Sequence, residues 1–365
     1  MSKKIGLVLG GLGGFNSISA AFLQAVVDRN VKFDAISCTS GAILTVSQML
    51  QQKSLRDYIK DLAEVTHPIP EKWISTAKKY DASEMVKMAN FFAFLEKSHW
   101  KWRKPNFLDF QKKYIEKSSH LMTAAMNGKL NFDIMLDTYF DLVAPAQKLI
   151  PSQDTEGLNA LFQIIQNAQI PILLNSLDLR SGKDIVHINK KGQNKKIEGM
   201  KVIDLVKANT FCKVEDLKMS DVLTALWLYQ FGFKDKNNKD MDIIDGAYHR
   251  QFIMKELAWC DKLVVVRPQE ANWVGPLPDN EIAVQDFMIE TWFNSAFTAE
   301  LSHIKTINKH IKEKRLLESI EYNHTDIEIF STKAQFSSFE YFVESLELFD
   351  ETYEKACDFL DELKI

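Results

Sequence analysis

The stretch Ile5–Leu44, IGLVLGGLGGFNSISAAFLQAVVDRNVKFDAISCTSGAIL, decides the fold of this 365-residue chain. It opens with a continuous apolar run that Gly10 ends, and apolar residues then recur at helical spacing through 17–30. Phe33–Cys38 is a second short apolar run. Buried strands that alternate with helices predict a parallel sheet covered on both faces. We therefore expect an α/β fold with three layers, α/β/α.

Helical signals dominate from about 45 to 168, and two β-rich runs follow on either side of a turn at 180–183. The sheet is therefore expected to resume after a helical insertion. We divide the chain into an α/β domain, 1–268, and a C-terminal helical extension packed on it, 269–365. The other elements that we expect are a helix within 216–233, a strand entering a turn within 241–248, a buried strand within 261–268 and helices through the last hundred residues.

Composition excludes several classes of protein. A net charge of −4 gives no reason to expect a nucleic acid as partner, because phosphate neutralisation needs a basic face. The four cysteines are far apart without a C-x-x-C pair, so we expect no disulfide framework and no zinc site. We expect no cofactor of another kind. The apolar run near the N-terminus is too short for a signal peptide or a membrane span. We expect a cytoplasmic protein, with peripheral membrane contact or export by a specialised secretion system as alternatives.

The glycine loop at 10–16, GGLGGFN, lies between the first expected strand and helix. Backbone N–H groups at such a place attract negative charge, either a phosphate or a developing oxyanion. A P-loop would need Lys-Ser/Thr where Phe15-Asn16 stand. A dinucleotide site would need an acid at the end of the second strand, whereas Asp34 lies at its start. An oxyanion hole would need a nucleophile at the end of that strand, and Ser40 stands there.

Ser40 lies between a short strand and a helix start. A serine nucleophile on such a sharp turn needs small residues two positions before and two after, and Cys38 and Ala42 are small. Gly41 adds local freedom. From this fragment alone, a serine that caps the following helix is an equal alternative.

A serine nucleophile needs a base, and no histidine is placed like a member of a triad, His249 being the nearest to any motif. Asp245 and Gly246 follow a strand, so the carboxylate is expected at the C-terminal edge of the sheet, where Ser40 is also expected. Asp245 could then act as the base directly. The alternative for this Asp-Gly pair is an ordinary turn.

The order of these motifs resembles the patatin-like phospholipase family, whose loop is G-x-G-x-x-G, whose elbow is G-x-S-x-G and whose acid lies in D-G-G or D-G-A. Gly11 and Gly13 match the loop glycines, Ser40 the nucleophile and Asp245 the acid, followed by Gly246-Ala247. The match runs through 5–42 and 171–268, and a weaker likeness to some bacterial members covers 293–309. The departures are Phe15 for a basic residue, Asn16 for the last loop glycine, Cys38 and Ala42 for the elbow glycines, and Gln251 and Ile253 where Asn and Pro often follow the acid.

The resemblance implies a serine hydrolase that acts on a phospholipid or lysophospholipid through a Ser40–Asp245 dyad without a metal. It implies an oxyanion hole at Gly11, Leu12 and Gly13, with Gly10, Gly14 and Gly41 as supporting glycines. The aromatic residues of the helical insertion are candidates for an apolar acyl channel. The alternatives are a catalytically impaired relative that binds a lipid or an unknown protein partner and, third, a nucleotide-binding protein.

One further run, His99–Pro105 (HWKWRKP), places tryptophans between cations. That pattern suits a membrane interface. The interpretation that we favour is the solvated end of a helix with tryptophan on its buried side.

Overall fold

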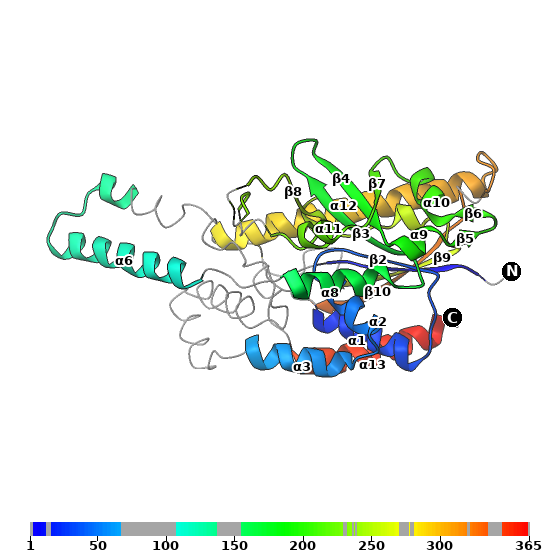
Figure 1. The fold of residues 1–365 in the computed structure, drawn as a ribbon, viewed down its shortest axis with the longest axis horizontal. Helices are drawn as coiled ribbons and strands as arrows, with labels where there is room; N and C mark the ends of the chain where they lie inside the picture. The colour runs from blue at the N-terminus through cyan, green and yellow to red at the C-terminus, as the bar shows by residue number, and fades with distance from the viewer. Residues whose placement is uncertain are drawn as a thin grey trace.

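The computed structural model describes residues 3–11, 16–66, 107–136, 155–228, 232–235, 237, 239–269, 277, 281–319, 322–334 and 345–363. Helices cover both faces of a central, mostly parallel sheet, as Figure 1 shows. The predicted three-layer α/β/α fold is therefore confirmed.

The central sheet has eight strands in the described chain, in the order β10-β9-β1-β2-β3-β4-β7, with β8 also paired to β3. Pairing is antiparallel only between β3 and β4 and between β3 and β8. The strands are β1 (Ile5–Leu9), β2 (Ala35–Cys38), β3 (Ile172–Asp178), β4 (Lys183–Ile188), β7 (Lys213–Asp216), β8 (Ile243–Asp245), β9 (Lys262–Gln269) and β10 (Asp326–Ala334), and β5 (Lys196–Ile197) and β6 (Met200–Lys201) form a separate pair.

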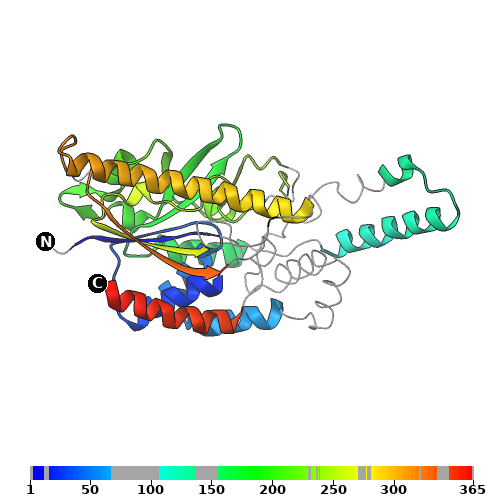
Figure 2. The same cartoon turned by 180° about the vertical axis from the view of Figure 1, so that it is seen from behind.

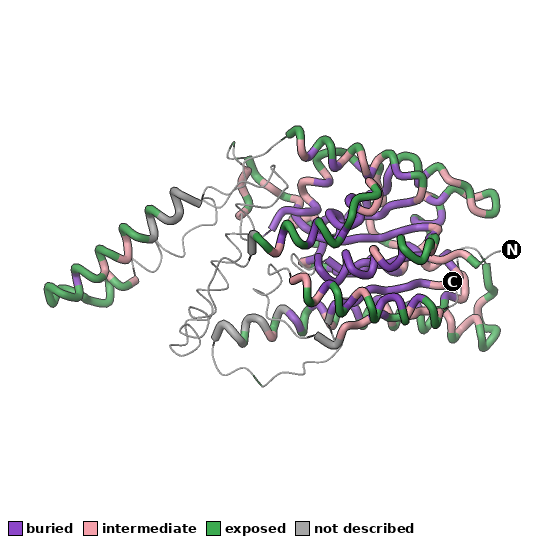
Figure 3. Tube along the Cα trace, turned by 90° about the horizontal axis from the view of Figure 1, so that it is seen from below, coloured by how far each residue is buried: buried purple, intermediate pink, exposed green. Residues whose placement is uncertain are grey.

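Side chains alternate along β1, so its apolar run fills both sides of the sheet. Leu7 and Leu9 pack into one buried cluster, whereas Val8 belongs to a second. The purple tube in Figure 3 follows this buried centre. The first cluster includes residues from α1 (Asn16–Asp28), α2 (Ala42–Leu50), α3 (Leu55–Thr66), α8 (Thr155–Gln166), α11 (Met219–Thr224) and α13 (Leu346–Leu363), and the second includes residues from α10 (Val202–Ala208), the 3₁₀ turn η4 (Lys255–Leu257) and α12 (Glu281–Lys312).

We expected the last hundred residues to be helical, and this prediction is wrong for one segment, which forms strand β10. β10 pairs with β9 in parallel and forms one edge of the central sheet. Its sequence alternates Asp326, Ile327, Glu328 and Ile329, which is the period of a strand rather than of a helix. Figure 2 shows β10 and the red helix α13 from behind. The division at residue 268 stays a prediction.

The helix expected within 216–233 is shorter than its apolar spacing indicated. α11 ends at Thr224, and the chain then turns through buried residues to Trp227. The carbonyl of Trp227 accepts a hydrogen bond from the Asp245 N–H at 3.1 Å. Tertiary pairing with β8 therefore replaces further helical hydrogen bonds at this point.

Candidate functional site

β2 and β8 share one edge of β3. β4 pairs with β3 from 173 to 178 and occupies its other edge. β2 pairs at Ile172 and Leu173, and β8 pairs at 176–178 in the opposite direction. β8 therefore runs toward the carboxyl end of β2, and Asp245 ends it directly opposite Ser176.

The register limits how far the candidate acid lies from the elbow. Ser37 pairs with Leu173, and Asp245 pairs with Ser176 three residues further along β3, a rise of about 10 Å. Cys38 and Thr39, followed by Ser40, fill that interval from the β2 side. The two residues of the proposed dyad are thus brought to one place on the sheet.

Ser40 adopts a left-handed backbone conformation, with φ +52°, and is buried. A side chain in that region costs about 1–2 kcal/mol, because the Cβ approaches the following carbonyl. Helical hydrogen bonding starts at once, since Ile43 N donates to Ser40 O at 3.0 Å. A strained residue between a strand and a helix is the geometry of a nucleophile elbow.

The Ser40 side chain does not cap α2. Gly41 is the N-cap residue, and the Ser40 hydroxyl makes no hydrogen bond to another residue within the described ranges, Asp245 included. Catalytic hydrogen bonds are often long in unliganded enzymes and tighten with substrate. The conformation therefore favours the nucleophile over the capping interpretation.

The small residues that replace the family's elbow glycines fit the turn. Cys38 and Ala42 are both buried in the core on either side of Ser40. Burial raises the pKa of the Cys38 thiol well above its usual range, so that thiol stays protonated and inert.

Gly11 brings the glycine loop against the elbow. A Cβ on Gly11 would lie 1.8 Å from the carbonyl oxygen of Thr39 and 2.7 Å from the Cβ of Ser40. A Cβ on Gly10 would lie 2.4 Å from the ring of Phe252. Only glycine permits both approaches. Three of the predicted loop residues, Leu12, Gly13 and Gly14, lie outside the described residues, as does Phe15.

Asp245 is fully buried, and its Oδ1 accepts a hydrogen bond from Ala247 N at 2.9 Å. Gly246 follows in a 3₁₀ turn, where a Cβ would lie 2.4 Å from the side chain of Asn175. Asn175 in turn donates from Nδ2 to the carbonyl of Arg250 at 2.9 Å. The Asp-Gly pair is thus part of a packed, hydrogen-bonded turn rather than an exposed loop.

Two hydrogen bonds join the segment after Asp245 to β2 and to the glycine loop. The Ser37 hydroxyl donates to the Ile253 carbonyl at 2.8 Å, which ties β2 to the segment after the acid. Gln251 Nε2 donates to the Gly11 carbonyl at 3.4 Å. Gln251 therefore supports the glycine loop through its side chain, whereas Ile253 contributes its backbone carbonyl, an acceptor that any residue at this position would offer.

Unpaired polar atoms lie beside the elbow. Among the described residues, Thr39 Oγ1 and Asn175 Oδ1 are buried without a hydrogen-bond partner. An unpaired buried polar atom costs about 1–3 kcal/mol, and a bound water or a substrate group would satisfy it.

A buried charge cluster holds the segment that follows Asp245. Arg250 contacts Asp184 at 2.8 Å, Glu256 at 2.9 Å and Glu300 at 3.1 Å. Burial alone would lower the pKa of Arg250, but these carboxylates outweigh it and raise that pKa. Burial likewise favours neutral Glu300, but Arg250 and Lys255 outweigh it and lower its pKa. The cluster joins β4, η4 and α12 around the acid motif.

His249, the histidine nearest to the motif, belongs to this cluster. Its Nδ1 lies 2.9 Å from Asp184 Oδ1. The hydrogen bond to Asp184 raises the pKa of His249, against the lowering effect of burial. Its structural partner is therefore Asp184 rather than a nucleophile.

The sequence interpretation missed a Ser-His-Asp chain beside Asp245. Ser176 Oγ lies 2.7 Å from His187 Nε2, and His187 Nδ1 lies 3.3 Å from Asp221 Oδ2. Burial would raise the pKa of Asp221, but His187 and backbone hydrogen bonds lower it. Ser176 and Asp245 are directly opposite and share a face. The register of the β3–β4 hairpin could have suggested the Ser176–His187 pair, whereas nothing in the sequence pointed to Asp221.

Comparisons with known proteins place the chain near no characterised family. No family model matches it, and no curated protein matches its sequence. Among solved structures, the crystal structure of VipD from Legionella pneumophila is similar over 99% of this chain and 67% of that chain, with 12% identity and a TM-score of 0.28. A similarity of this size assigns neither a family nor an activity.

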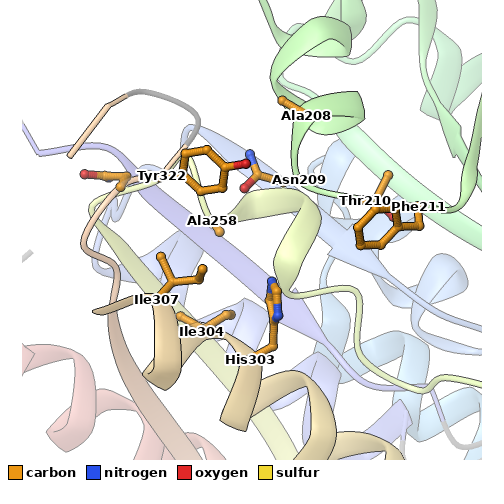
Figure 4. A pocket seen from close by; sticks show the side chains of 10 residues that line it. Ala208, Asn209, Thr210, Phe211, Ala258, His303, Ile304, Ile307 and Tyr322 are labelled. Carbon is orange, nitrogen blue, oxygen red and sulfur yellow. The ribbon is translucent and has the colours of Figure 1, made fainter. Parts of the chain in front are cut away.

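A cavity of about 210 Å³ lies between the α10–β7 connection, the residues before β9, and α12 (Figure 4). His303, Ile304 and Phe211 are among its lining residues, whereas Ser40 and Asp245 are not. It is therefore separate from the elbow.

Neither a metal-binding cluster nor a membrane-spanning helix is present among the described residues. No cluster of three or more metal-ligating side chains occurs among them. No helix there is both long and apolar enough to cross a bilayer. The run 99–105, with its tryptophans between cations, lies outside the described residues.

Proposed function

We propose that this protein is a serine hydrolase of lipid acyl esters, of the phospholipase A or lysophospholipase type. The observation that carries the proposal is the left-handed Ser40 on a strand-to-helix turn with Gly11 against it. The buried Asp245, which ends β8 on the same edge of β3, supplies the candidate base.

In the proposed reaction, Asp245 takes the proton of Ser40 while Oγ attacks the ester carbonyl carbon. The backbone N–H groups of Gly11, Leu12 and Gly13 are the proposed donors to the oxyanion. The proton on Asp245 passes to the departing alcohol, which leaves an acyl-Ser40 ester. A water that Asp245 deprotonates then attacks this ester, and as the bond from the acyl carbon to Ser40 Oγ breaks, Asp245 returns the proton to Oγ and the fatty acid is released.

The resemblance to patatin-like phospholipases supports the same assignment. Its nucleophile, its acid and its leading glycines are present, and the turn that needs small residues forms with Cys38 and Ala42. A lipid ester is the proposed substrate because the resemblance points there; the choice between a phospholipid and a lysophospholipid is left to the assay.

A catalytically impaired relative that binds a lipid or protein partner is the second candidate. One observation favours it: Ser40 is 3% exposed, and no hydrogen bond joins its hydroxyl to Asp245. The two candidates differ in whether Ser40 reacts.

The test combines labelling by a fluorophosphonate probe with turnover of short-chain p-nitrophenyl esters. Ser40→Ala and Asp245→Asn are compared with the controls Ser47→Ala, which changes a buried serine of α2, and Asp242→Asn, which changes an exposed acid three residues earlier. Activity that both site variants lose and both controls keep would support the hydrolase. A wild-type protein that is neither labelled nor active would favour the impaired relative.

A further inference from the structure

Residues 107–136 form an arm. It consists of α6 (Phe107–Met126), a turn, and a short helical stretch at 132–136. In Figures 1 and 2 the arm stands clear of the sheet and of its covering helices, at the end away from both termini. Figure 3 shows most of its described residues as exposed.

The tip of the arm, defined as residues 126–132, is a well-formed turn. Gly128 has φ +63°, its N–H donates to Ala125 O at 3.1 Å, and Lys129 N donates to Ala124 O at 2.9 Å. These two bonds are those of a Schellman motif. Asn131 Oδ1 then accepts from Ile134 N at 2.9 Å and caps the next helical stretch. The tip is therefore a specified structure and not a frayed helix end.

This specified turn presents apolar side chains to solvent. Met126 is 80% exposed and Phe132 is 71% exposed, with Leu130 also exposed between them. Ile115 and Met122 are exposed on α6, eleven and four residues before Met126 and hence on its side of the helix. A cluster of exposed apolar residues on an ordered element marks an interaction surface.

The positive charge of the arm favours an anionic partner. Residues 107–136 hold four lysines against three acids, a net +1, in a chain whose net charge is −4. Lys129 lies within the apolar tip, where its stem can follow the inserted side chains while its ammonium stays at the headgroups. Lys129 is the one charged residue of the tip, with Asp133 directly after the tip, and apolar anchors beside a cation suit the surface of an anionic bilayer.

We propose that the tip docks on an anionic lipid bilayer and inserts Met126, Leu130 and Phe132 at the boundary between headgroups and acyl chains. Docking is a separate property from hydrolysis. Its relevance to catalysis rests on the proposed function: the parallel strands β1 and β2 run toward the end of the molecule that carries the arm (Figure 1), so docking would bring lipid to the Ser40 edge.

The test is flotation with vesicles of phosphatidylcholine alone or mixed with phosphatidylglycerol, in a Ser40→Ala background that leaves the lipid intact. We expect flotation with the mixed vesicles, and a loss of roughly tenfold or more in the Met126→Ser, Leu130→Ser, Phe132→Ser triple variant. Lys129→Glu should weaken flotation with the mixed vesicles only. The control is Phe211→Ser, which removes a fully exposed aromatic side chain after α10 and should float normally.

The proposal is overturned if the parent protein does not float, or if the triple variant floats like the control. It is also overturned if the triple variant converts a dimer to a monomer in light scattering without changing flotation, because the tip would then bind a second copy. Turnover of soluble p-nitrophenyl esters, measured with Ser40 present, should be unchanged by the tip variants. Tip-dependent flotation without any turnover would contradict the proposed function and leave the docking site standing.

Discussion

Gly11 and Ser40 are packed so closely that a Cβ on the glycine would lie 2.7 Å from the Cβ of the serine. The backbone of the glycine loop is therefore held against the candidate nucleophile. The N–H groups of an oxyanion hole have to lie near the nucleophile, because the attacked carbonyl carbon becomes bonded to the serine oxygen.

Gly11→Ala should inactivate the protein and cost about 1–3 kcal/mol of unfolding free energy, because the new methyl group would overlap the Thr39 carbonyl. Urea denaturation and ester turnover check the two effects. Gly182→Ala is the control, since that glycine has φ +66° with no atom within 4 Å of an added Cβ. It should lose some stability but keep full turnover. Wild-type turnover in Gly11→Ala would contradict the role of the loop.

The strained backbone of Ser40 predicts a conflict between stability and function. Ser40→Gly and Ser40→Ala both remove the hydroxyl, but only glycine relieves the left-handed conformation. Ser40→Gly should be more stable than Ser40→Ala by about 1 kcal/mol, while both are inactive. Position 47, in the helical interior of α2, provides the reverse comparison: Ser47→Gly should be less stable than Ser47→Ala. If the alanine variant were more stable than the glycine variant at position 40, as it should be at position 47, Ser40 would not be strained in solution.

Arg250→Met should be strongly destabilising, by about 3–5 kcal/mol, because it leaves the carboxylates of Asp184, Glu256 and Glu300 buried without their shared cation. Arg56→Met is the control, since its ion pair with Asp350 is half exposed and should contribute little. Chemical denaturation of both variants measures the difference. If Arg250→Met lowered the free energy of unfolding no more than the control does, the three carboxylates would have to be protonated or paired with other cations.

His249 predicts a pH-dependent contribution to stability. Its pKa is raised above the ordinary 6.5 in the folded state, so protonation favours folding. The contribution is fully present below about pH 6.5 and is lost as the pH rises through the higher folded-state pKa. His249→Gln should therefore lower the melting temperature at pH 5.5–6 and leave it nearly unchanged at pH 9. An equal decrease at both pH values would contradict this link to Asp184.

The sequence predicted the parts of the fold that local pattern determines. The apolar runs gave β1, β2, β3, β4 and β9, and the turn chemistry gave the hairpin at Gly182 and the end of β8 at Asp245. A sharp turn at Ser40 was predicted from the residues that flank it, but the left-handed backbone of Ser40 itself was not. The Ser40–Asp245 pairing as a catalytic dyad stays a prediction, because it depends on chemistry that only an assay measures.

The features that the sequence did not predict depend on distant partners. Arg250 meets Asp184 and Glu300, which lie 66 and 50 residues away along the chain. His187 contacts Asp221 through the packing of α11 on the sheet. β10 does have a local strand signal, the alternation from Asp326 to Ile329, but its place beside β9 at the edge of the sheet depends on a distant partner. The spacing of residues along the chain does not show which distant residues will be in contact.

β2 and β8 pair with the same edge of β3, one after the other. This arrangement determines where residues can be inserted into the chain or deleted from it. β2 and β3 are adjacent, so the chain that leaves the sheet after β2 returns to it beside β2. Residues could be gained or lost between α2 and β3 without altering the separation of Ser40 from Asp245, because the ladder on β3 positions both β2 and β8. The interval between α2 and β3 is accordingly the place where relatives of this protein could acquire different substrates or partners while retaining one reaction.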